Sequence, residues 1–205
     1  MHPDEHLRAA DPVMAALIDE GGPLPLEPDR RGRPLEPYGA LVRSIAGQQL
    51  SVKAAASIFR RLTDRYGGRA PTPEELLAED PEELRAACGF SRAKVASLRS
   101  LAEHVIDGRL ELDRLHELDD EAIIAELVAV KGIGVWTAQM FLMFTLQRPD
   151  VLPTGDLGVR NGAMRAYGLP APPPPEELTA LAEPWRPFRT RACLYLWRSL
   201  DNAPV

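Results

Sequence analysis

The chain has 205 residues, 45% of them hydrophobic, and a formal net charge of −6 at pH 7. This length and composition predict a globular protein with a sizeable core, in one compact unit or two small lobes, and argue against a tail or a filament. No run approaches the roughly 18 apolar residues that span a bilayer, and the N-terminus, MHPDEHLRAADP, lacks the segments of a signal peptide, so we expect a cytoplasmic protein without membrane contact.

Helical patterns cover most of the chain, and no β-branched segment of useful length alternates with period 2, so we expect an all-α fold. In the first half, Thr72-Pro73 and Asp80-Pro81 each place a capping residue before a proline at the first helical position, which predicts two helix starts. The stretch 21–37, rich in Gly, Pro and Arg, is expected to be a surface connector. The other helices expected in this half are 11–20, 38–46, 51–66 and 92–107.

In the second half, Asp119 is the expected cap of a helix whose apolar residues form one stripe. A later helix is apolar almost all round, which is typical of a buried element. The proline-rich stretch 170–175 is expected to be a stiff connector. The helices expected in this half are 120–130, 135–147, 157–167, 176–182 and 187–200.

A glycine-rich turn, Gly132-Ile133-Gly134, separates the helices 120–130 and 135–147. Glycine adopts φ > 0 and lets another backbone approach closely, so both glycines suit a tight hairpin whose Ile133 plugs into the core. The second helix would point its unpaired N–H groups and its positive dipole end outward, which suits a phosphate and can hold a nucleic-acid backbone without reading its sequence. The same pattern also occurs as a plain helix C-cap, so the turn by itself leaves both interpretations open.

The hairpin 130–138 (VKGIGVWTA), the helix after it and the loop 153–159 (PTGDLGV) together resemble the signature of the helix–hairpin–helix DNA glycosylases. Within that superfamily the chain is most similar to the 3-methyladenine DNA glycosylase II branch, over roughly residues 37–200. The resemblance implies a monofunctional enzyme of base excision repair that flips alkylated bases, such as 3-methyladenine and 7-methylguanine, out of double-stranded DNA and hydrolyses the N-glycosidic bond. It also implies a nucleoid-associated monomer.

The resemblance further implies two helical lobes with the active-site cleft between them. One lobe would join both chain ends, as residues 1–43 and 155–205, and the other, residues 44–154, would carry the helix–hairpin–helix motif.

Asp156 is the expected catalytic residue, because an ionised carboxylate near C1′ stabilises the positive charge that develops on the sugar. It also reads as the N-cap of the helix that begins at Leu157, and the two roles are compatible because a helix N-terminus keeps a carboxylate ionised. Asp150 and Glu183 are poorer candidates for the catalytic carboxylate, because neither falls in the family pattern.

A flipped, methylated base binds well between aromatic faces, and Trp136 and Trp197 match aromatic positions of the family's pocket. A buried tryptophan is more often simple core, so neither position carries the assignment by itself. Met140 stands where some relatives place an aromatic residue, which leaves the pocket's selectivity open.

The turn Gln48-Gln49-Leu50 between the first two helices of the resemblance is similar to the family's wedge-bearing turn, which fills the gap that a flipped base leaves. Gln49 aligns best with the intercalating position and Leu50 is the next choice. An ordinary interhelical turn explains the same residues equally well.

DNA contacts are expected along the hairpin and in the arginine-rich segment 184–199, which contains no acid, whereas residues 74–83 and 111–126 are strongly acidic. The expected DNA-binding residues are Gln48, Gln49, Leu50, Lys131, Gly132, Ile133, Gly134, Thr137 and Arg189. The resemblance also implies a monovalent cation, sodium or potassium, held by the main-chain carbonyls of Val128, Val130 and Ile133.

Two other functions compete with this interpretation. A bifunctional glycosylase and lyase for oxidised bases would need a Schiff-base lysine two residues after the second hairpin glycine, where this chain has Trp136. A non-catalytic module that docks on DNA would need neither Asp156 nor an aromatic pocket.

We expect no catalytic cofactor. Cys88 and Cys193 are too few for an iron–sulfur cluster or a disulfide framework, and both lie in apolar helical patterns that predict buried free thiols. The four histidines show no metal-site spacing, so no structural zinc is expected.

Overall fold

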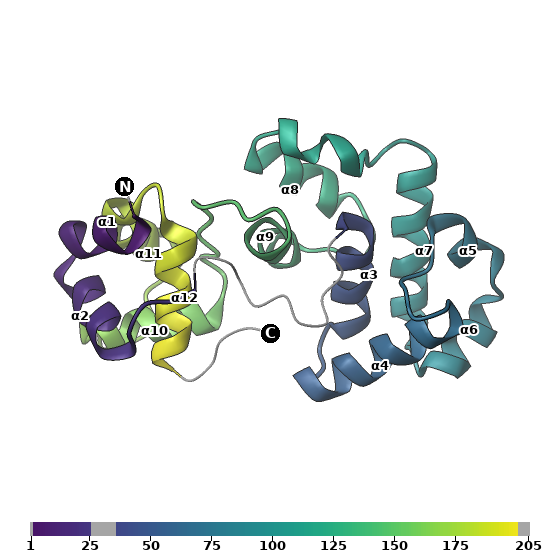
Figure 1. Cartoon of the computed structure of the whole chain (residues 1–205), viewed down its shortest axis with the longest axis horizontal. Helices are drawn as coiled ribbons and strands as arrows, with labels where there is room; N and C mark the ends of the chain where they lie inside the picture. The colour runs from purple at the N-terminus through teal and green to yellow at the C-terminus, as the bar shows by residue number, and fades with distance from the viewer. Residues whose placement is uncertain (1, 26–35, 201–205) are drawn as a thin grey trace. The chain divides into compact units, whose positions relative to one another are not determined.

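The computed structural model of the protein describes residues 2–25 and 36–200, and within these ranges it contains helices and no strands. The chain forms two compact units (Figure 1). Unit 1 joins the two chain ends, Met1–Asp29 and Leu142–Val205, and unit 2 is the continuous segment Arg30–Phe141. The expected all-α class is confirmed.

Unit 1 is built around its last helix, which packs against α10, α2 and α1. The largest fully buried side chains of this unit include Trp185, Tyr195 and Trp197, all from the C-terminal segment. The helices of unit 1 are α1 (Pro3–Ala10), α2 (Pro12–Gly21), α10 (Leu157–Tyr167), α11 (Pro175–Leu181), the 3-10 helix η2 (Glu183–Trp185) and α12 (Arg189–Ser199).

Unit 2 is built around one central helix, α7, which packs against α3, α5 and α6. The last helix that begins in this unit, α9, ends in unit 1, so the boundary between the units falls inside it. The helices of unit 2 are α3 (Pro37–Gly47), α4 (Val52–Arg65), α5 (Pro73–Ala78), α6 (Pro81–Cys88), α7 (Arg92–Ile106), the 3-10 helix η1 (Leu112–Glu117), α8 (Asp120–Val128) and α9 (Val135–Phe144).

The unit boundaries differ from the expected division at 43/44 and 154/155. Helix α3 belongs to unit 2 because it packs against α4 and α7. Residues 142–154 belong to unit 1 because the segment 148–151 is hydrogen-bonded to Thr190 of α12.

The helix starts follow the capping chemistry that the sequence predicts. Thr72 and Glu75 form a reciprocal capping box, in which Glu75 N donates to Thr72 Oγ1 at 3.2 Å and Thr72 N donates to Glu75 Oε2 at 2.8 Å. Asp80 accepts from the backbone N–H groups of the first turn of α6, and Asp119 does the same for α8. Gly89 ends α6 in the left-handed conformation at φ 76°.

Three short elements were not expected from the sequence: α1, η1 and η2. Helix α1 contributes a single apolar side chain, Leu7, to the core, and its other buried residue is Asp4. One buried apolar residue is too few for a helical period to be recognised in the sequence. The expected connector 21–37 falls largely on residues 26–35, which lie outside the described residues.

Cys88 and Cys193 are buried free thiols, as the sequence predicts. None of the helices within residues 2–25 and 36–200 is both long enough and apolar enough to span a bilayer.

Candidate active site

The hairpin between α8 and α9 has one glycine in the left-handed region and one outside it. Gly132 has φ 83°, as a tight turn requires, whereas Gly134 is not among the residues with positive φ. Ile133 is 4% exposed, and its N–H donates to Val130 O at 3.1 Å. The expected insertion of Ile133 into the core is confirmed, and the expected need for positive φ holds only at Gly132.

Helix α7 packs against the hairpin through Ser97 and Ser100. A Cβ atom at Gly132 would overlap Ser97 Oγ and lie 2.9 Å from Ser97 Cβ, so no side chain fits there. Lys131 N donates to Ser100 Oγ at 3.2 Å. A Cβ atom at Gly134 would meet nothing within 4 Å, so the packing of this chain does not itself require glycine at that position.

The first two residues of α9, Val135 and Trp136, are exposed. Trp136 is 46% exposed and Met140, one turn later on the same helix, is half-buried. Thr137 is 6% exposed, so its side chain is buried in this structure, and its expected contact with DNA stays a prediction. Lys131 is exposed just before the glycines.

The turn between α3 and α4 is bonded to the hairpin. Gln48 Nε2 donates to Gly132 O at 2.8 Å, and Lys94 Nζ of α7 donates to Ala46 O, near the end of α3, at 2.8 Å. Burial lowers the pKa of Lys94. At the tip, Gln49 has φ 58°, unusual for a side-chain-bearing residue, and both Gln49 and Leu50 are exposed. Gln48 therefore links the turn to the hairpin, and Gln49 and Leu50 stay the candidates for the wedge.

Asp156 is buried at the N-terminus of α10, with 9% of its surface exposed. Its Oδ1 accepts from Val159 N at 2.7 Å, which is the N-cap bond that the sequence predicts. The same oxygen accepts from Trp197 Nε1 of α12 at 2.9 Å. These two N–H donors therefore orient the carboxylate.

Trp197 has contacts that the sequence did not reveal. It is 2% exposed, and its ring stacks on Phe144 at the end of α9, with centroids 6.1 Å apart and planes 25° apart. A Cβ atom at Gly158 would lie 2.9 Å from Trp197 Cδ1 and Nε1 and 3.0 Å from Asp156 Oδ1. Phe144 and Gly158 therefore help to hold the carboxylate, and the glycine after Asp156-Leu157 is the sequence signal for this close packing. Stacking of Trp197 on a base stays a prediction.

Arg189, an expected DNA-binding residue, is paired with an acid of the same unit. Its side chain is 13% exposed, and its guanidinium forms an ion pair with Asp150, with Nε 2.6 Å from Oδ1. The acid-free composition of segment 184–199 favoured a phosphate contact, but the partner acid lies 39 residues earlier in the chain. In this structure the charge of Arg189 is therefore engaged within unit 1.

The predicted site residues divide between the units. Asp156, Trp197 and Arg189 belong to unit 1, and the wedge turn, the hairpin, Trp136 and Met140 belong to unit 2. Within the described ranges, no group of three or more His, Cys, Asp or Glu side chains is arranged to hold a metal ion.

The family model of the HhH-GPD superfamily, base excision DNA repair proteins, matches residues 42–187. DNA-3-methyladenine glycosylase 1 of Schizosaccharomyces pombe is 42% identical to the chain over 174 residues, which cover 84% of this chain and 76% of the yeast protein.

Two solved structures are similar over almost the whole chain. The S. pombe 3-methyladenine DNA glycosylase in complex with abasic DNA has a TM-score of 0.85 at 39% identity and covers 97% of this chain and 96% of its own. A DNA-3-methyladenine glycosidase from Bacillus halodurans has a TM-score of 0.86 at 37% identity and covers 97% of this chain and 89% of its own.

Proposed function

The chain belongs to the HhH-GPD superfamily of base excision DNA repair proteins, and from that premise we propose that it is a monofunctional DNA glycosylase for alkylated bases. It hydrolyses the N-glycosidic bond of bases of the 3-methyladenine and 7-methylguanine type in double-stranded DNA. The observation that carries this proposal is the buried Asp156 carboxylate, oriented by Val159 N–H and by Trp197 Nε1–H in the loop of the family signature.

The proposed chemistry follows from that carboxylate. The C1′–N bond breaks with its electron pair leaving on the base, and a methylated, positively charged purine accepts that pair readily. The sugar then develops positive charge at C1′, which the Asp156 carboxylate stabilises. Water adds to C1′ and loses a proton, and the products are the free base and an abasic site.

We further propose that the exposed ring of Trp136 forms one wall for the flipped base. An aromatic face attracts a cationic, electron-poor base by stacking and by the cation–π interaction. Gln49 or Leu50, exposed at the tip of the α3–α4 turn, fills the gap in the duplex. Met140 lies one turn beyond Trp136 and contributes to the choice among bases.

The hairpin is the proposed phosphate-binding element. Gly132 and Gly134 are exposed, Lys131 adds a positive charge, and the start of α9 supplies N–H groups that have no acceptor within the helix. The main-chain carbonyls of Val128, Val130 and Ile133 would hold a monovalent cation. Val130 O accepts one hydrogen bond from Ile133 N, and a carbonyl has a second lone pair for such an ion.

Lyase chemistry is not part of this proposal. Trp136, at the position of the lyase lysine, has no nucleophilic nitrogen, and Lys131 lies on the other side of the hairpin glycines. Borohydride should therefore trap no covalent adduct with DNA, and product strands should stay intact until alkali is added. A monomer that works on nucleoid DNA in the cytoplasm completes the proposal.

The test is the substitution Asp156→Asn, which keeps an oxygen acceptor for Val159 and Trp197 but removes the charge. We expect base release from duplex DNA with one 7-methylguanine to be lost and DNA affinity to be nearly unchanged, because the charge acts in the transition state. Asp80→Asn, which changes the N-cap of α6 in the same way, is the matched control and should retain activity. Normal excision by Asp156→Asn would refute the assignment.

A further inference from the structure

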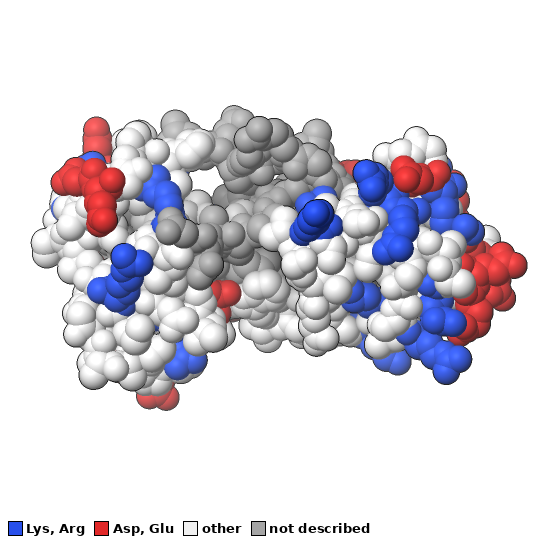
Figure 2. Space-filling view, turned by 90° about the horizontal axis from the view of Figure 1, so that it is seen from below, with Lys and Arg blue, Asp and Glu red and all other residues white. Residues whose placement is uncertain are grey.

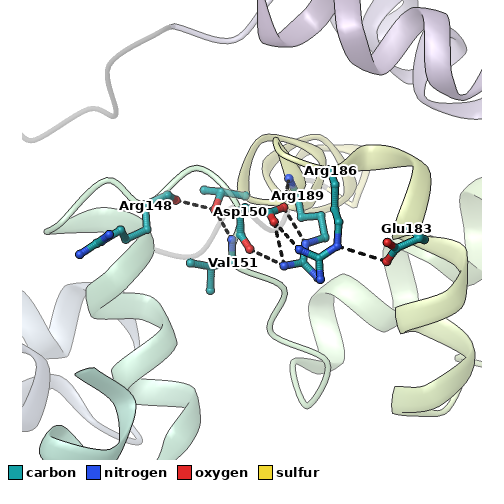
Figure 3. Close-up of polar contacts among 7 residues, drawn as sticks. Arg148, Asp150, Val151, Glu183, Arg186 and Arg189 are labelled. Carbon is teal, nitrogen blue, oxygen red and sulfur yellow. Dashed lines mark hydrogen bonds and ion pairs between the residues drawn. The ribbon is translucent and has the colours of Figure 1, made fainter. Parts of the chain in front are cut away.

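The loop that carries Asp156 is attached to α12 at two places. At its downstream end, Trp197 Nε1 donates to Asp156 Oδ1 at 2.9 Å. At its upstream end, residues 148–151 are bound to the first turn of α12 (Figure 3). The proposed mechanism uses the first attachment and not the second.

Thr190 provides the backbone part of the upstream attachment. Its N–H donates to Pro149 O at 3.0 Å, and its Oγ1 donates to Arg148 O at 2.7 Å and accepts from Val151 N at 3.0 Å. One residue of α12 thereby fixes the backbone on both sides of Asp150.

The carboxylate of Asp150 provides the ionic part. Arg189 Nε donates to Asp150 Oδ1 at 2.6 Å and Arg189 Nη2 donates to Oδ2 at 3.0 Å, while the same Nη2 donates to Asp150 O at 2.7 Å. The side chains of Asp150 and Arg189 are 23% and 13% exposed. A two-pronged pair of this kind restricts geometry far more than a single exposed contact.

Arg186 contacts the same carboxylate (Figure 3). Its Nη1 donates to Asp150 Oδ2 at 2.6 Å and its Nε donates to Glu183 Oε2 at 3.2 Å. The side chains of Arg186 and Glu183 are 47% and 66% exposed, so their pair contributes little. In the part of the chain that the structure describes, Glu183 is bonded to Arg186 and has no hydrogen bond or ion pair with residues 148–151, which makes it a matched control.

The turns of the loop explain why the upstream attachment matters. Thr154 N donates to Leu152 O at 3.0 Å and Asp156 N donates to Pro153 O at 2.9 Å, and Val151, Leu152 and Pro153 are buried. A shift at Asp150 is therefore passed on to Asp156 through a short, packed segment. A displacement of about 1 Å at a reacting group can cost about 100-fold in rate.

We propose that Asp150, held by Arg189, is a positioning residue for cleavage of the glycosidic bond. The Asp150–Arg189 pair and Thr190 set the register of the loop on α12 and so the orientation of the Asp156 carboxylate. This inference rests on the proposed glycosylase function. It also replaces the expected phosphate contact of Arg189 with a role inside the protein.

The experiment measures single-turnover excision from duplex DNA with one 7-methylguanine, at 25 °C, for the full-length protein. Asp150→Asn should lower the maximal rate by about 10- to 100-fold while the half-saturating protein concentration changes less than about twofold. Arg189→Lys keeps the charge but loses the two-pronged contact with the Asp150 carboxylate, so it should lower the maximal rate in the same way. Glu183→Gln should match the wild type.

Arg189→Lys also keeps the test decisive if Asp150→Asn does not fold, and thermal unfolding of each variant shows that it is folded at 25 °C. An Asp150→Asn variant that is folded and as fast as the wild type would overturn the inference. A loss confined to DNA affinity, with full activity of Arg189→Lys, would overturn it too and restore the phosphate contact. A wild-type protein inert on every alkylated base would remove the proposed function and this inference together, so the two failures are distinguishable.

Discussion

Three aspartates are buried within the described residues, and nitrogen donors hold each of them. Asp4 pairs with Arg191, whose Nε and Nη2 donate at 2.7 and 2.8 Å. Asp11 and Asp156 share a different arrangement, in which the carboxylate caps a helix and also accepts from an indole N–H, from Trp185 and Trp197 respectively, each at 2.9 Å. The same local chemistry thus serves stability at one site and the proposed catalysis at the other.

The substitution Asp11→Asn tests the stabilising member of this pair. The carboxylate accepts from Val13 N at 2.8 Å, from Trp185 Nε1 and from Tyr167 Oη. An amide nitrogen facing the buried indole N–H leaves two donors opposed, so unfolding by urea at pH 7 should require about 1–3 kcal/mol less free energy. Asp19→Asn, an exposed change on the same helix α2, should cost much less.

The effect of Asp11→Asn should depend on pH. Burial alone would raise the pKa of Asp11, but hydrogen bonds from Tyr167, Trp185 and the backbone lower it below its ordinary value of 3.8. A lowered folded-state pKa stabilises the protein fully above the unfolded-state pKa, and this stabilisation is lost as the pH falls through the folded-state pKa. The difference in unfolding free energy between wild type and variant should therefore be constant above about pH 5 and shrink below about pH 4. A difference that grows on acidification would contradict this account.

At the residue scale, local chemistry could be predicted and distant partners could not. The N-cap role of Asp156 follows from residues next to it in the chain, and the structure confirms it. Its indole donor lies 41 residues later and the acid partner of Arg189 lies 39 residues earlier. Partners so far apart in the chain meet only because α12 packs against the loop. Local sequence patterns carry no information about that packing.

At the scale of elements, the hairpin contains two glycines with different requirements. Gly132 combines φ 83° with a contact that leaves no room for a Cβ atom beside Ser97. Gly132→Ala should therefore lower the free energy of unfolding by more than about 1 kcal/mol and weaken DNA binding, because the hairpin must move off α7. Thermal or urea unfolding and DNA titration measure the two effects.

Gly134→Ala is the matched control for that substitution. A Cβ atom there meets no atom of this chain within 4 Å, so stability should be unchanged. DNA affinity should nevertheless fall, because the added methyl group occupies the surface that a phosphate would approach. Unchanged affinity for Gly134→Ala would mean that DNA does not approach the hairpin closely at this glycine.

Helix positions could be predicted where capping residues and apolar periodicity agree, as at α5, α6 and α8. Helix α1 was missed because a buried ion pair holds it in place of an apolar stripe. Asp4 is 5% exposed and Arg191 is 8% exposed. An acid in a first helical turn reads as solvated, and only the tertiary structure reveals its partner.

At the scale of the whole molecule, the net charge of −6 hides a separation of charges. Figure 2 shows one face on which Lys and Arg side chains gather over unit 2, with Asp and Glu side chains gathered at its edge. Within residues 2–25 and 36–200, the exposed Lys53, Arg60 and Arg61 of α4 form no ion pair with an acid. A protein with an acidic total can therefore present positive charge to phosphates.

Salt dependence separates cations that face DNA from cations that serve the fold. Each phosphate contact contributes about 0.9 to the slope of log affinity against log salt concentration. Lys131 is exposed on the hairpin, so Lys131→Gln should weaken binding equally for all sequences and reduce the slope by about 1. Arg189 is paired with Asp150, so Arg189→Gln should leave the slope unchanged even if excision slows.

Fluorescence anisotropy with undamaged duplexes from about 50 to 200 mM salt measures both slopes. A reduced slope for Arg189→Gln would show that DNA binding breaks the pair with Asp150, and an unchanged slope for Lys131→Gln would place the phosphate contacts elsewhere on unit 2.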